Sequence, residues 1–305
     1  MTPELSVILP MYNEEAVAER AVAEVSAQLA ALGRSFEILC VDDGSADGTA
    51  RVLHAIAALD DRVVPVIFSR NFGKEAAMAA GLELARGKAV LLMDADLQHP
   101  PELIPQLVAA WEQGFDVVDA VKAHRGNEGL AYKLAARAFY ALMGNSVGQR
   151  LHGSSDFKLL DRQVVDAVLA CRERSRFFRG LVAWVGFRVK QVPFEVRARA
   201  AGQTSWGLRG LIAYSLRNIL AFSTVPLRVV AAMGFVTVAL DGLLGVQTLW
   251  NWWRGVAVDG FTTVILVQGL LGGLVLIALG VVAIYLAQVA EEQKARPMFL
   301  IRKPR

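Results

Sequence analysis

Residues 88–101 read Lys88-Ala89-Val90-Leu91-Leu92-Met93-Asp94-Ala95-Asp96-Leu97-Gln98-His99-Pro100-Pro101. The apolar run before Asp94 predicts a short buried strand, and the proline pair predicts where the chain turns away from it. Two carboxylates, Asp94 and Asp96, follow the strand directly, and the amide of Gln98 comes two residues later. In a parallel sheet the carboxyl ends of the strands border the ligand crevice, so these groups predict a site for Mg²⁺ or Mn²⁺ shared with a substrate diphosphate. An Asp-X-Asp triplet also occurs on solvated turns, so the motif needs support from the rest of the chain.

The same order of strand, loop and helix recurs along the N-terminal part of the chain. Short apolar runs predict strands, and apolar residues at helical spacing predict the helices between them. The expected strands are Leu5–Pro10, Phe36–Val41, Val63–Phe68 and Asp116–Val121, and the expected helices are Ala16–Leu32, Asp47–Leu59 and Glu75–Ala85. Strands that alternate with helices imply right-handed crossovers, and therefore an α/β fold with a mostly parallel sheet and ligands at the strand ends.

Further polar residues follow other strands of this expected sheet. The segment Asp42–Gly44 comes directly after the second strand and so falls on the same rim as Asp94. An ordinary Asp-Gly turn that caps the next helix is the alternative interpretation. Gly73 and Lys74 open a helix, where backbone N–H groups and a cation could hold a phosphate. The chain has no Gly-x-Gly-x-x-Gly and no Gly-Lys-Ser/Thr sequence, which disfavours a dinucleotide dehydrogenase and a P-loop ATPase.

The composition indicates a membrane protein with one soluble domain. The 305 residues are 54% hydrophobic and have a mean hydropathy of +0.40. Two apolar runs, Val229–Trp250 and Phe261–Val289, are each about 20 residues or longer, which is enough to span a bilayer. A net charge of +3 is too small to indicate nucleic acid binding. Basic residues on both flanks of the spans predict that both flanks are cytoplasmic; they are Arg209, Arg217, Arg228, Lys294, Arg296, Arg302, Lys303 and Arg305.

Six motifs distributed over essentially the whole chain carry a family resemblance. They are Pro10–Glu15, Val41–Ser45, Ser69–Lys74, Asp94–Gln98, Phe178–Leu181 with Trp184–Gly186, and Ser223–Arg228. In these residues the chain resembles the membrane-bound polyprenyl-phosphate glycosyltransferases of glycosyltransferase family 2, the group that includes dolichyl-phosphate mannose synthase and the bactoprenol glucosyltransferases. The resemblance implies a GT-A fold, a nucleotide-sugar donor and a polyprenyl-phosphate acceptor.

The resemblance also implies which residues bind the donor. The nucleoside would be bound by Pro10, Tyr12, Glu14 and Asp42. Lys74 would approach the donor, and Arg199 begins a segment similar to the family's loop that closes on the diphosphate. Many relatives carry a lysine after the Ser or Thr of that loop, where this chain has Ser205. One phosphate contact is therefore missing, and the role of the loop depends more heavily on Arg199.

A second set of residues is assigned to the metal and to catalysis by the same resemblance. Asp94, Asp96 and Gln98 would hold Mg²⁺ or Mn²⁺ on the diphosphate, and Asp96 is for that reason counted with the catalytic residues. Asp156 matches the family position just ahead of a short strand that faces the donor sugar. Its alternative role is to cap a helix or strand.

We therefore expect four consecutive parts. These are a cytoplasmic catalytic domain over 1–200, a diphosphate loop and interfacial helix over 201–228, two membrane helices over 229–289 and a basic cytoplasmic tail over 290–305. Amphipathic patterns predict helices over Gly129–Met143 and Gly207–Phe222, which would lie at the bilayer surface or pack on the core. The expected location is the inner (cytoplasmic) membrane, with both termini in the cytoplasm.

The expected reaction is transfer of a hexose from a nucleotide diphosphate to undecaprenyl phosphate in one in-line displacement that inverts the anomeric centre. UDP-glucose ranks first as donor, ahead of UDP-N-acetylglucosamine, other UDP-sugars and GDP-mannose. An acceptor phosphate monoester has a second pKa of about 6 and is largely dianionic at neutral pH, so no strong general base is required. Asp156 is assigned an orienting or base role. Arg125 and Arg137 are expected to clamp the acceptor phosphate.

Two other functions compete with this hypothesis. A processive polysaccharide synthase can share the domain, but it would need more spans and usually a Gln-x-x-Arg-Trp motif, which this chain lacks. A membrane scaffold built on an inactive transferase predicts eroded carboxylates, whereas the four expected ones are present. Within the first span, Asp241 is expected to pair with Gln268 of the second, inside one hairpin or between subunits of a homo-oligomer.

Overall fold

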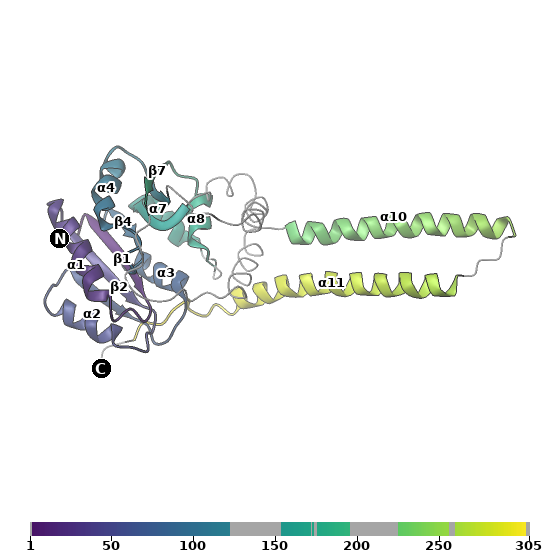
Figure 1. Ribbon diagram of the computed structural model, residues 1–305, viewed down its shortest axis with the longest axis horizontal. Coiled ribbons are helices and arrows are strands. Elements are labelled where there is room, and N and C mark those ends of the chain that lie inside the picture. Colours follow the sequence, from purple (N-terminus) through teal and green to yellow (C-terminus); the bar gives the residue numbers. More distant parts are fainter. Residues whose placement is uncertain are drawn as a thin grey trace. The chain divides into compact units, whose positions relative to one another are not determined.

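The computed structural model describes residues 2–122, 154–171, 173, 176–195, 225–255 and 260–302 (Figure 1). Two compact units divide the chain. The first is Met1–Ala213 together with Arg296–Arg305, and the second is Tyr214–Ala295. The first unit contains a seven-stranded sheet, and the second contains two long helices.

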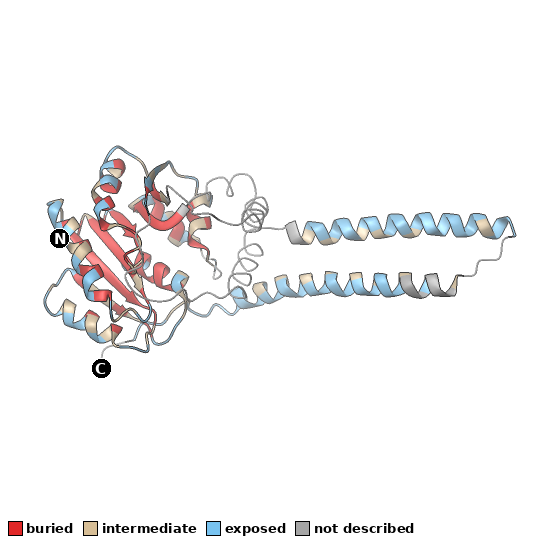
Figure 2. Ribbon diagram, in the orientation of Figure 1, coloured by how far each residue is buried: buried red, intermediate tan, exposed pale blue. Residues whose placement is uncertain are grey.

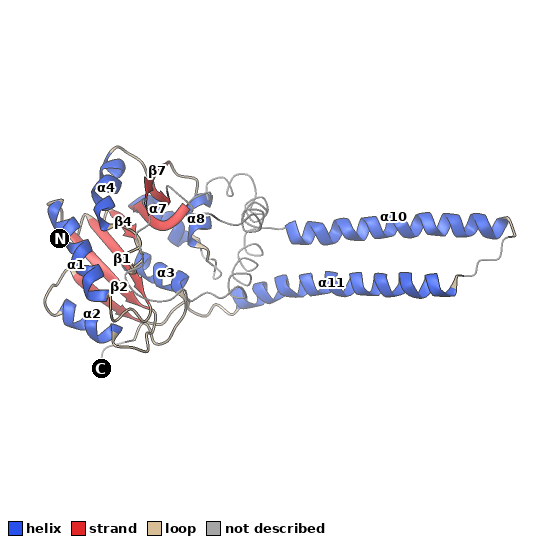
Figure 3. Cartoon of the chain, viewed as in Figure 1, coloured by secondary structure: helices blue, strands red, loops and turns tan. Residues whose placement is uncertain are grey.

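The sheet of the first unit has the strand order β3-β2-β1-β4-β6-β5-β7. Its strands are drawn in red in Figure 3. Its strands are β1 (Leu5–Met11), β2 (Phe36–Asp42), β3 (Val63–Ile67), β4 (Ala89–Leu92), β5 (Val117–Lys122), β6 (Ser154–Asp161) and β7 (Val189–Phe194). Strands β1 to β4 pair in parallel, as do β5 and β7. Among the seven strands that the structure describes, only β6 runs antiparallel, against both β4 and β5. The prediction of a mostly parallel sheet is confirmed, and the reversed β6 is the departure from it.

The central strands are buried on both faces, which explains why they are continuous apolar runs and not alternating ones. Every residue of β2 is buried, and β1 is buried except at Pro10 (Figure 2). Buried Cys40 lies within β2, where burial raises the pKa of its thiol to about 12 and leaves it an inert apolar side chain. The strands therefore form the core on which the helices pack.

Helices cover both faces of the sheet. They are α1 (Ala18–Ala31), α2 (Thr49–Ala57), α3 (Lys74–Leu84), α4 (Ile104–Glu112, after a 3-10 turn at Pro101–Leu103), α7 (Arg162–Ala170) and α8 (Phe178–Trp184). Helix α1 buries Ala18, Ala21, Val22, Val25 and Leu29, the one-sided spacing of an amphipathic helix. Helix α3 lies so close to β1 that a Cβ added to Gly81 would stand 2.3 Å from Ile8. Small residues in α3 therefore permit its close packing on the sheet.

The register of the parallel strands brings their carboxyl ends to one edge. Met11 at the end of β1 pairs with Asp42 at the end of β2, and Asp42 pairs with Ile67 at the end of β3. Leu92, the last residue of β4, pairs with Ile8 of β1. The loops that follow these four strands carry most of the residues singled out from the sequence.

The second unit contains α10 (Val225–Trp253) and α11 (Phe261–Gln293). Within them, Leu227–Trp253 and Val267–Gln293 have mean hydropathies of 2.1 and 2.6 and are long and apolar enough to cross a membrane. Most of the described side chains on both helices are exposed or half-buried in the chain, unlike those of the sheet (Figure 2). An apolar surface of this extent requires lipid or another apolar partner.

Candidate active site

The carboxylates after β4 lie in a row on one side of the chain. Burial alternates from Asp94 to His99: Asp94, Asp96 and Gln98 are half-exposed, whereas the residues between them are buried. Leu97 has a φ of 58°, in the left-handed region, and is only 3% exposed. The backbone N–H of Gln98 donates to Asp96 Oδ1 at 3.1 Å. This turn therefore presents two carboxylates and one amide together toward solvent.

A buried histidine stabilises the turn that carries these carboxylates. His99 is 6% exposed and stacks on Phe157 of β6, with ring centroids 5.1 Å apart. Its Nδ1 accepts from the backbone N–H of Asp94 at 3.4 Å. Burial lowers the pKa of His99, so the ring is a neutral acceptor at Nδ1. His99 lies within residues 88–101, but no local sequence pattern distinguishes its role.

Lys74, the first residue of α3, connects two of the predicted site residues. Its Nζ lies 2.5 Å from Asp94 Oδ1 and 2.8 Å from Asp156 Oδ2. Burial works to lower the pKa of Lys74, but the charges of Asp156 and Asp94 outweigh it and raise the pKa above its ordinary value. Lys74 is therefore a fixed positive charge between two carboxylates that are 62 positions apart in the sequence.

Asp156 on β6 is held by two cations. Arg179 of α8 makes a bidentate contact, from Nε to Oδ1 at 2.6 Å and from Nη2 to Oδ2 at 2.9 Å, and Lys74 shares Oδ2. Burial works to raise the pKa of Asp156, but Lys74 and Arg179 prevail and hold it well below its usual range. A carboxylate with so low a pKa is a weak base. The sequence placed Arg179 in a family motif without a role, and the structure shows that it orients Asp156.

A second buried ion pair lies next to this group in β6. Lys158 Nζ is 2.5 Å from Asp119 Oδ1, and both side chains are 3% exposed. Burial lowers the pKa of Lys158, and the charge of Asp119 opposes that shift. Because Asp119 lies opposite Lys158 on β5, the pair fixes the antiparallel register that aligns Asp156 with the site.

Asp42 ends β2 on the same rim. Its Oδ1 accepts from the backbone N–H of Ser45 at 3.0 Å and from the Ser45 hydroxyl. Its Oδ2 is buried and has no hydrogen-bond partner among the described residues. A buried acceptor without a partner is costly, so this atom fits a ligand N–H donor.

The loop after β1 is joined to the loop after β2 by hydrogen bonds. The Asn13 N–H donates to Ser45 Oγ at 2.8 Å, and the Glu14 N–H donates to Thr49 Oγ1 at 2.9 Å. Tyr12 is 48% exposed beside them, and Pro10 is half-buried at the end of β1. The structure thus brings Pro10, Tyr12, Glu14 and Asp42 to one edge of the sheet.

Asp43 organises the loop that precedes Lys74. Its carboxylate accepts from the backbone N–H groups of Phe72 at 2.6 Å and Gly73 at 2.9 Å. Burial raises the pKa of Asp43, and the two N–H groups oppose that shift. An Asp-Gly turn is the alternative interpretation of this segment from the sequence. Gly44 does occupy a turn conformation, with φ 66°, but Asp43 reaches across to the loop after β3.

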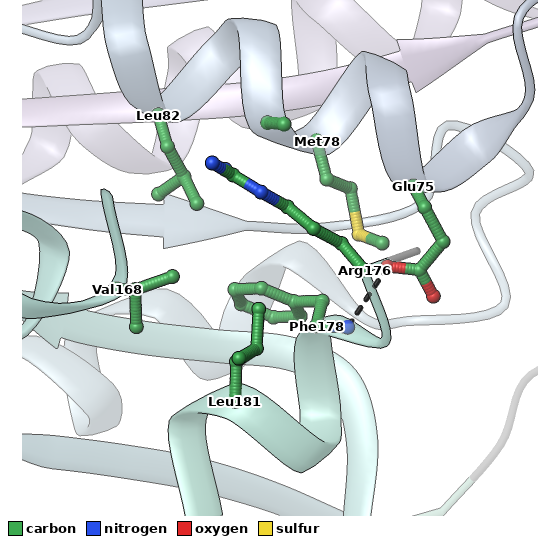
Figure 4. Close-up of a pocket in the computed structure, with 8 residues that line it drawn as sticks. Glu75, Met78, Leu82, Val168, Arg176, Phe178 and Leu181 are labelled. Atoms are coloured by element: carbon green, nitrogen blue, oxygen red, sulfur yellow. Dashed lines mark hydrogen bonds between the residues drawn. The ribbon is translucent and has the colours of Figure 1, made fainter. Parts of the chain in front are cut away.

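A small pocket lies between α3, α7 and α8 (Figure 4). Glu75 of α3 points into it and accepts from the Phe178 N–H at 2.9 Å. Burial raises the pKa of Glu75 to about 7, against the opposing effect of that N–H. Apolar side chains make up most of the remaining lining: Met78, Ala79, Leu82, Val168, Phe178 and Leu181. Glu75 therefore fixes the start of α8, directly before Arg179.

The residues on the rim suit a hard divalent cation. Two carboxylates and an amide on one side of a turn are oxygen donors of the kind that Mg²⁺ and Mn²⁺ use. The described residues contain no group of three or more His, Cys, Asp and Glu side chains placed to hold a metal by themselves. A cation shared between one or two carboxylates and a substrate diphosphate does not need such a group. Three other predicted residues, Arg125, Arg137 and Arg199, lie outside the described residues.

A mostly parallel sheet with carboxylates and a lysine at its strand ends is typical of α/β proteins whose ligand site lies at that edge. The chain matches "Glycosyl transferase family 2" over residues 6–169. It is 40% identical to an uncharacterized glycosyltransferase of Synechocystis sp., with 99% of this chain and 95% of that one covered. It is 34% identical to the bactoprenol glucosyl transferase of Shigella phage SfII, with 98% of each covered.

The chain therefore belongs to glycosyltransferase family 2, and it is an enzyme of that class. Its fold is similar to that of mannosyl-3-phosphoglycerate synthase from Rubrobacter xylanophilus, with a TM-score of 0.51 at 22% identity over 72% of this chain and 73% of that one. A likeness at this identity concerns the fold alone. The family membership and the GT-A fold expected from the sequence are both confirmed.

Proposed function

We propose that this protein transfers glucose from UDP-glucose to a polyprenyl phosphate, undecaprenyl phosphate in bacteria, at the cytoplasmic face of the membrane with inversion of the anomeric centre. The observation that carries the proposal is the row of Asp94, Asp96 and Gln98 beside Lys74, on the rim that also holds the unpartnered oxygen of Asp42. Similarity to a bactoprenol glucosyl transferase over 98% of both chains supports glucose and the lipid acceptor. The two apolar helices support a membrane-embedded acceptor.

On the donor side, each group has a distinct task. Asp42 Oδ2, which lacks a partner among the described residues, would accept from an N–H of the nucleoside base, and exposed Tyr12 would offer an aromatic face beside it. Asp94, Asp96 and Gln98 would hold Mg²⁺ or Mn²⁺, which supplies positive charge against the leaving diphosphate. Lys74 adds a fixed cation at the same edge. These residues favour departure of the diphosphate by stabilising its negative charge.

Asp156 acts in this mechanism by orientation and not as a base. Its low pKa makes it a poor proton acceptor, and Arg179 and Lys74 already occupy both of its oxygens. The acceptor needs no strong base, because a phosphate monoester with a second pKa of about 6 is largely dianionic at neutral pH. Of the two roles expected for Asp156, the geometry supports the orienting one.

The acceptor side rests on residues that the structure does not describe. Arg125 and Arg137 remain predictions as the clamp on the lipid phosphate, and Arg199 remains a prediction as part of the diphosphate loop. A guanidinium pair binds phosphate in a defined geometry, so Arg125→Ala and Arg137→Ala should raise KM for the lipid phosphate more than KM for the donor. Equal effects on the two KM values would count against the assignment. Cytoplasmic placement of both termini likewise follows from the basic flanks alone.

One experiment tests the proposal directly. Purified protein in detergent is incubated with undecaprenyl phosphate and a panel of labelled nucleotide sugars, and the lipid fraction is analysed for label. We expect label from UDP-glucose in the lipid fraction, and none when the lipid phosphate is left out. Label from GDP-mannose alone would overturn the donor assignment. Label in a water-soluble polymer and none in lipid would overturn the acceptor assignment.

A further inference from the structure

The C-terminal segment of the chain extends the edge of the sheet. Residues 299–302 lie against the end of β3, the edge strand, and belong to the first unit. The Ser69 N–H donates to Leu300 O at 2.9 Å, and the Arg302 N–H donates to Ile67 O at 2.7 Å. Phe68 and Ile301 form an antiparallel bridge. The segment thus adds to the sheet in the way that an extended peptide augments an edge strand.

A run of aromatic rings continues from this segment into the site. Phe299 stacks on Phe68, with centroids 5.2 Å apart and an interplanar angle of 6°. Phe68 meets Phe72 edge to face at 5.8 Å and 86°, and the Arg70 guanidinium lies 4.1 Å above the Phe72 ring. Phe68 is only 2% exposed, so the middle ring is fully enclosed. Such ring pairs favour a defined relative position of the two rings, in addition to burying their apolar surface.

The loop at the end of this run leads directly to the donor groups. The N–H groups of Phe72 and Gly73 donate to Asp43, and Gly73 takes a φ of 98°. The next residue is Lys74, whose Nζ contacts Asp94 and Asp156. Any shift of Phe72 therefore moves the start of α3 and the cation that lies between the two carboxylates.

We propose that the segment Phe299–Arg302 is a positioning element of the donor site. It holds the loop Ser69–Lys74, through Phe68 and Phe72, in the conformation that binds the nucleoside diphosphate of the donor. The inference rests on the proposed function, because it takes a nucleoside diphosphate as the ligand. The end of the chain, expected from the sequence to be only a basic tail, thereby takes part in binding the donor.

A segment on an edge strand can also serve only to shield that edge from pairing with other chains. Two observations favour positioning over shielding. Among the described residues, the two backbone hydrogen bonds fall at Ile67 and Ser69, where β3 passes into the loop, and not along the length of β3. The ring of Phe299 contacts the residue that in turn contacts Phe72 inside the loop.

The test uses the full-length protein in detergent with UDP as the probe. Phe299→Ala should raise the Kd for UDP, measured by calorimetry with Mg²⁺ or Mn²⁺ present, about fivefold, the size expected when one aromatic pair is lost. Phe299→Tyr keeps the ring and should bind as the wild type does. Leu300→Ala is the matched control, because it removes apolar volume from the same segment at a side chain that is 52% exposed.

Hydrogen exchange provides a second readout that needs no ligand. In Phe299→Ala the amides of Ser69, Phe72 and Gly73 should exchange faster, whereas those of β1 should not change. If Phe299→Ala does not fold, Arg302→Pro removes the donor to Ile67 and leaves the three rings intact, and the same two measurements apply. A lower melting temperature with an unchanged Kd and unchanged exchange in the loop would overturn the proposal and leave edge shielding. Failure of the wild type to bind UDP would instead overturn the donor assignment.

Discussion

Neighbouring aspartates in this protein have different tasks because their hydrogen-bond partners differ. Asp42 keeps one buried oxygen without a partner among the described residues, so it can receive a ligand. Asp43 uses its carboxylate on two backbone N–H groups and so holds a loop. The sequence places both on the rim of the sheet but does not distinguish them. The difference depends on Phe72 and Gly73, which come about thirty positions later and meet Asp43 only in the folded chain.

The carboxylates after β4 lead to a prediction about metal dependence. Chelation with EDTA should abolish turnover, and Mg²⁺ or Mn²⁺ should restore it. Asp96→Asn replaces a charged oxygen donor with a neutral amide and should lower turnover by at least about a hundredfold, the size of losing one group that stabilises charge in the transition state. The melting temperature should stay near that of the wild type, since Asp96 is half-exposed.

Asp60→Asn is the matched control for the metal prediction. Asp60 pairs with Arg62 just before β3, at the opposite end of that strand from the site loop. This variant should keep wild-type turnover and the same response to EDTA. Full turnover of Asp96→Asn in EDTA would exclude a metal at this turn.

The pKa of Glu75 leads to a prediction about stability and pH. Its pKa rises from an ordinary 4.5 to about 7 on folding, chiefly through burial. Between these values the folded protein binds more protons than the unfolded chain, so the free energy of unfolding falls as the pH rises through that window. Glu75→Gln removes this loss and keeps an oxygen acceptor for the Phe178 N–H. The free energy of unfolding of the variant should equal that of the wild type near pH 4 and exceed it above pH 7. The expected difference is about 1 to 3 kcal/mol, a range that allows for the partial exposure of Glu75.

Thermal melting of both proteins over that pH range measures the difference. Glu83→Gln is the control, since Glu83 lies on the same helix with its side chain exposed. A constant offset between Glu75→Gln and the wild type at all pH values would show that Glu75 does not titrate in this window.

At the scale of elements, the strands and helices of the parallel half follow from the sequence closely. Each prediction there rested on local pattern: a continuous apolar run for a strand buried on both faces, and one-sided spacing for a helix such as α1. The reversed β6 did not follow, because its pairing partners β4 and β5 precede it by a long stretch of chain. The pairing of Ile301 with Phe68 joins residues more than two hundred positions apart, and no local pattern indicates it.

The site residues divide in the same way, into those that local sequence pattern predicts and those that it does not. Asp94, Asp96 and Asp42 were found because carboxylates directly after strands have a known place in a parallel sheet. Contacts between distant residues, such as Arg179 with Asp156 or Glu75 with Phe178, depend on how α8 packs against β6 and meets α3, and so could not be read from spacing.

A comparison of Gly44, in the loop after β2, with Gly33, before β2, tests the role of that loop. Gly33 and Gly44 have nearly equal φ values of 65° and 66°. A Cβ added at Gly33 would meet nothing within 4 Å, whereas one at Gly44 would stand 2.3 Å from the Arg70 backbone carbon. Gly33→Ala should therefore cost only the strain of the left-handed conformation, about 1 kcal/mol. Gly44→Ala carries the same strain and must also displace Arg70.

Because Arg70 lies in the loop Ser69–Lys74, Gly44→Ala should weaken UDP binding as well as lower the melting temperature. Gly33→Ala should lower the melting temperature alone. Melting and calorimetric titration of the two variants measure both effects. Equal Kd values for UDP would show that the approach of Gly44 to Arg70 does not determine the donor site.

At the scale of the molecule, the two units differ in where their apolar side chains lie. The first unit buries its apolar side chains between sheet and helices, and its polar groups meet at the rim. The second exposes large apolar side chains along both helices, which is stable only where lipid or another apolar surface covers them. Similarity to relatives over nearly their full length includes both units, so the apolar helices are part of the relatives' chains as well.

Asp241 is the exception to the apolar character of α10, and it leads to a prediction about assembly. A central aspartate costs about 2.5 to 3.5 kcal/mol in a membrane helix unless it is neutralised or paired. The sequence predicts Gln268, on the second helix, as its partner. The glycines Gly242, Gly245, Gly269, Gly272 and Gly273 have open space where a Cβ would lie, so no neighbour among the described residues of one chain fills these positions. Small residues with open space permit close approach of a helix from another copy, which favours pairing between subunits.

Asp241→Leu and Gln268→Leu should therefore reduce the mass of the purified particle or its melting temperature in detergent, while the Kd for UDP stays at the wild-type value. Asp241→Asn is the matched control, because it keeps a side chain able to hydrogen-bond the Gln268 amide and should retain the assembly. Light scattering measures the mass, and calorimetry measures binding in the same preparation. If both leucine variants keep the wild-type mass and melting temperature, the polar pair does not hold the subunits together, and the open glycines face lipid.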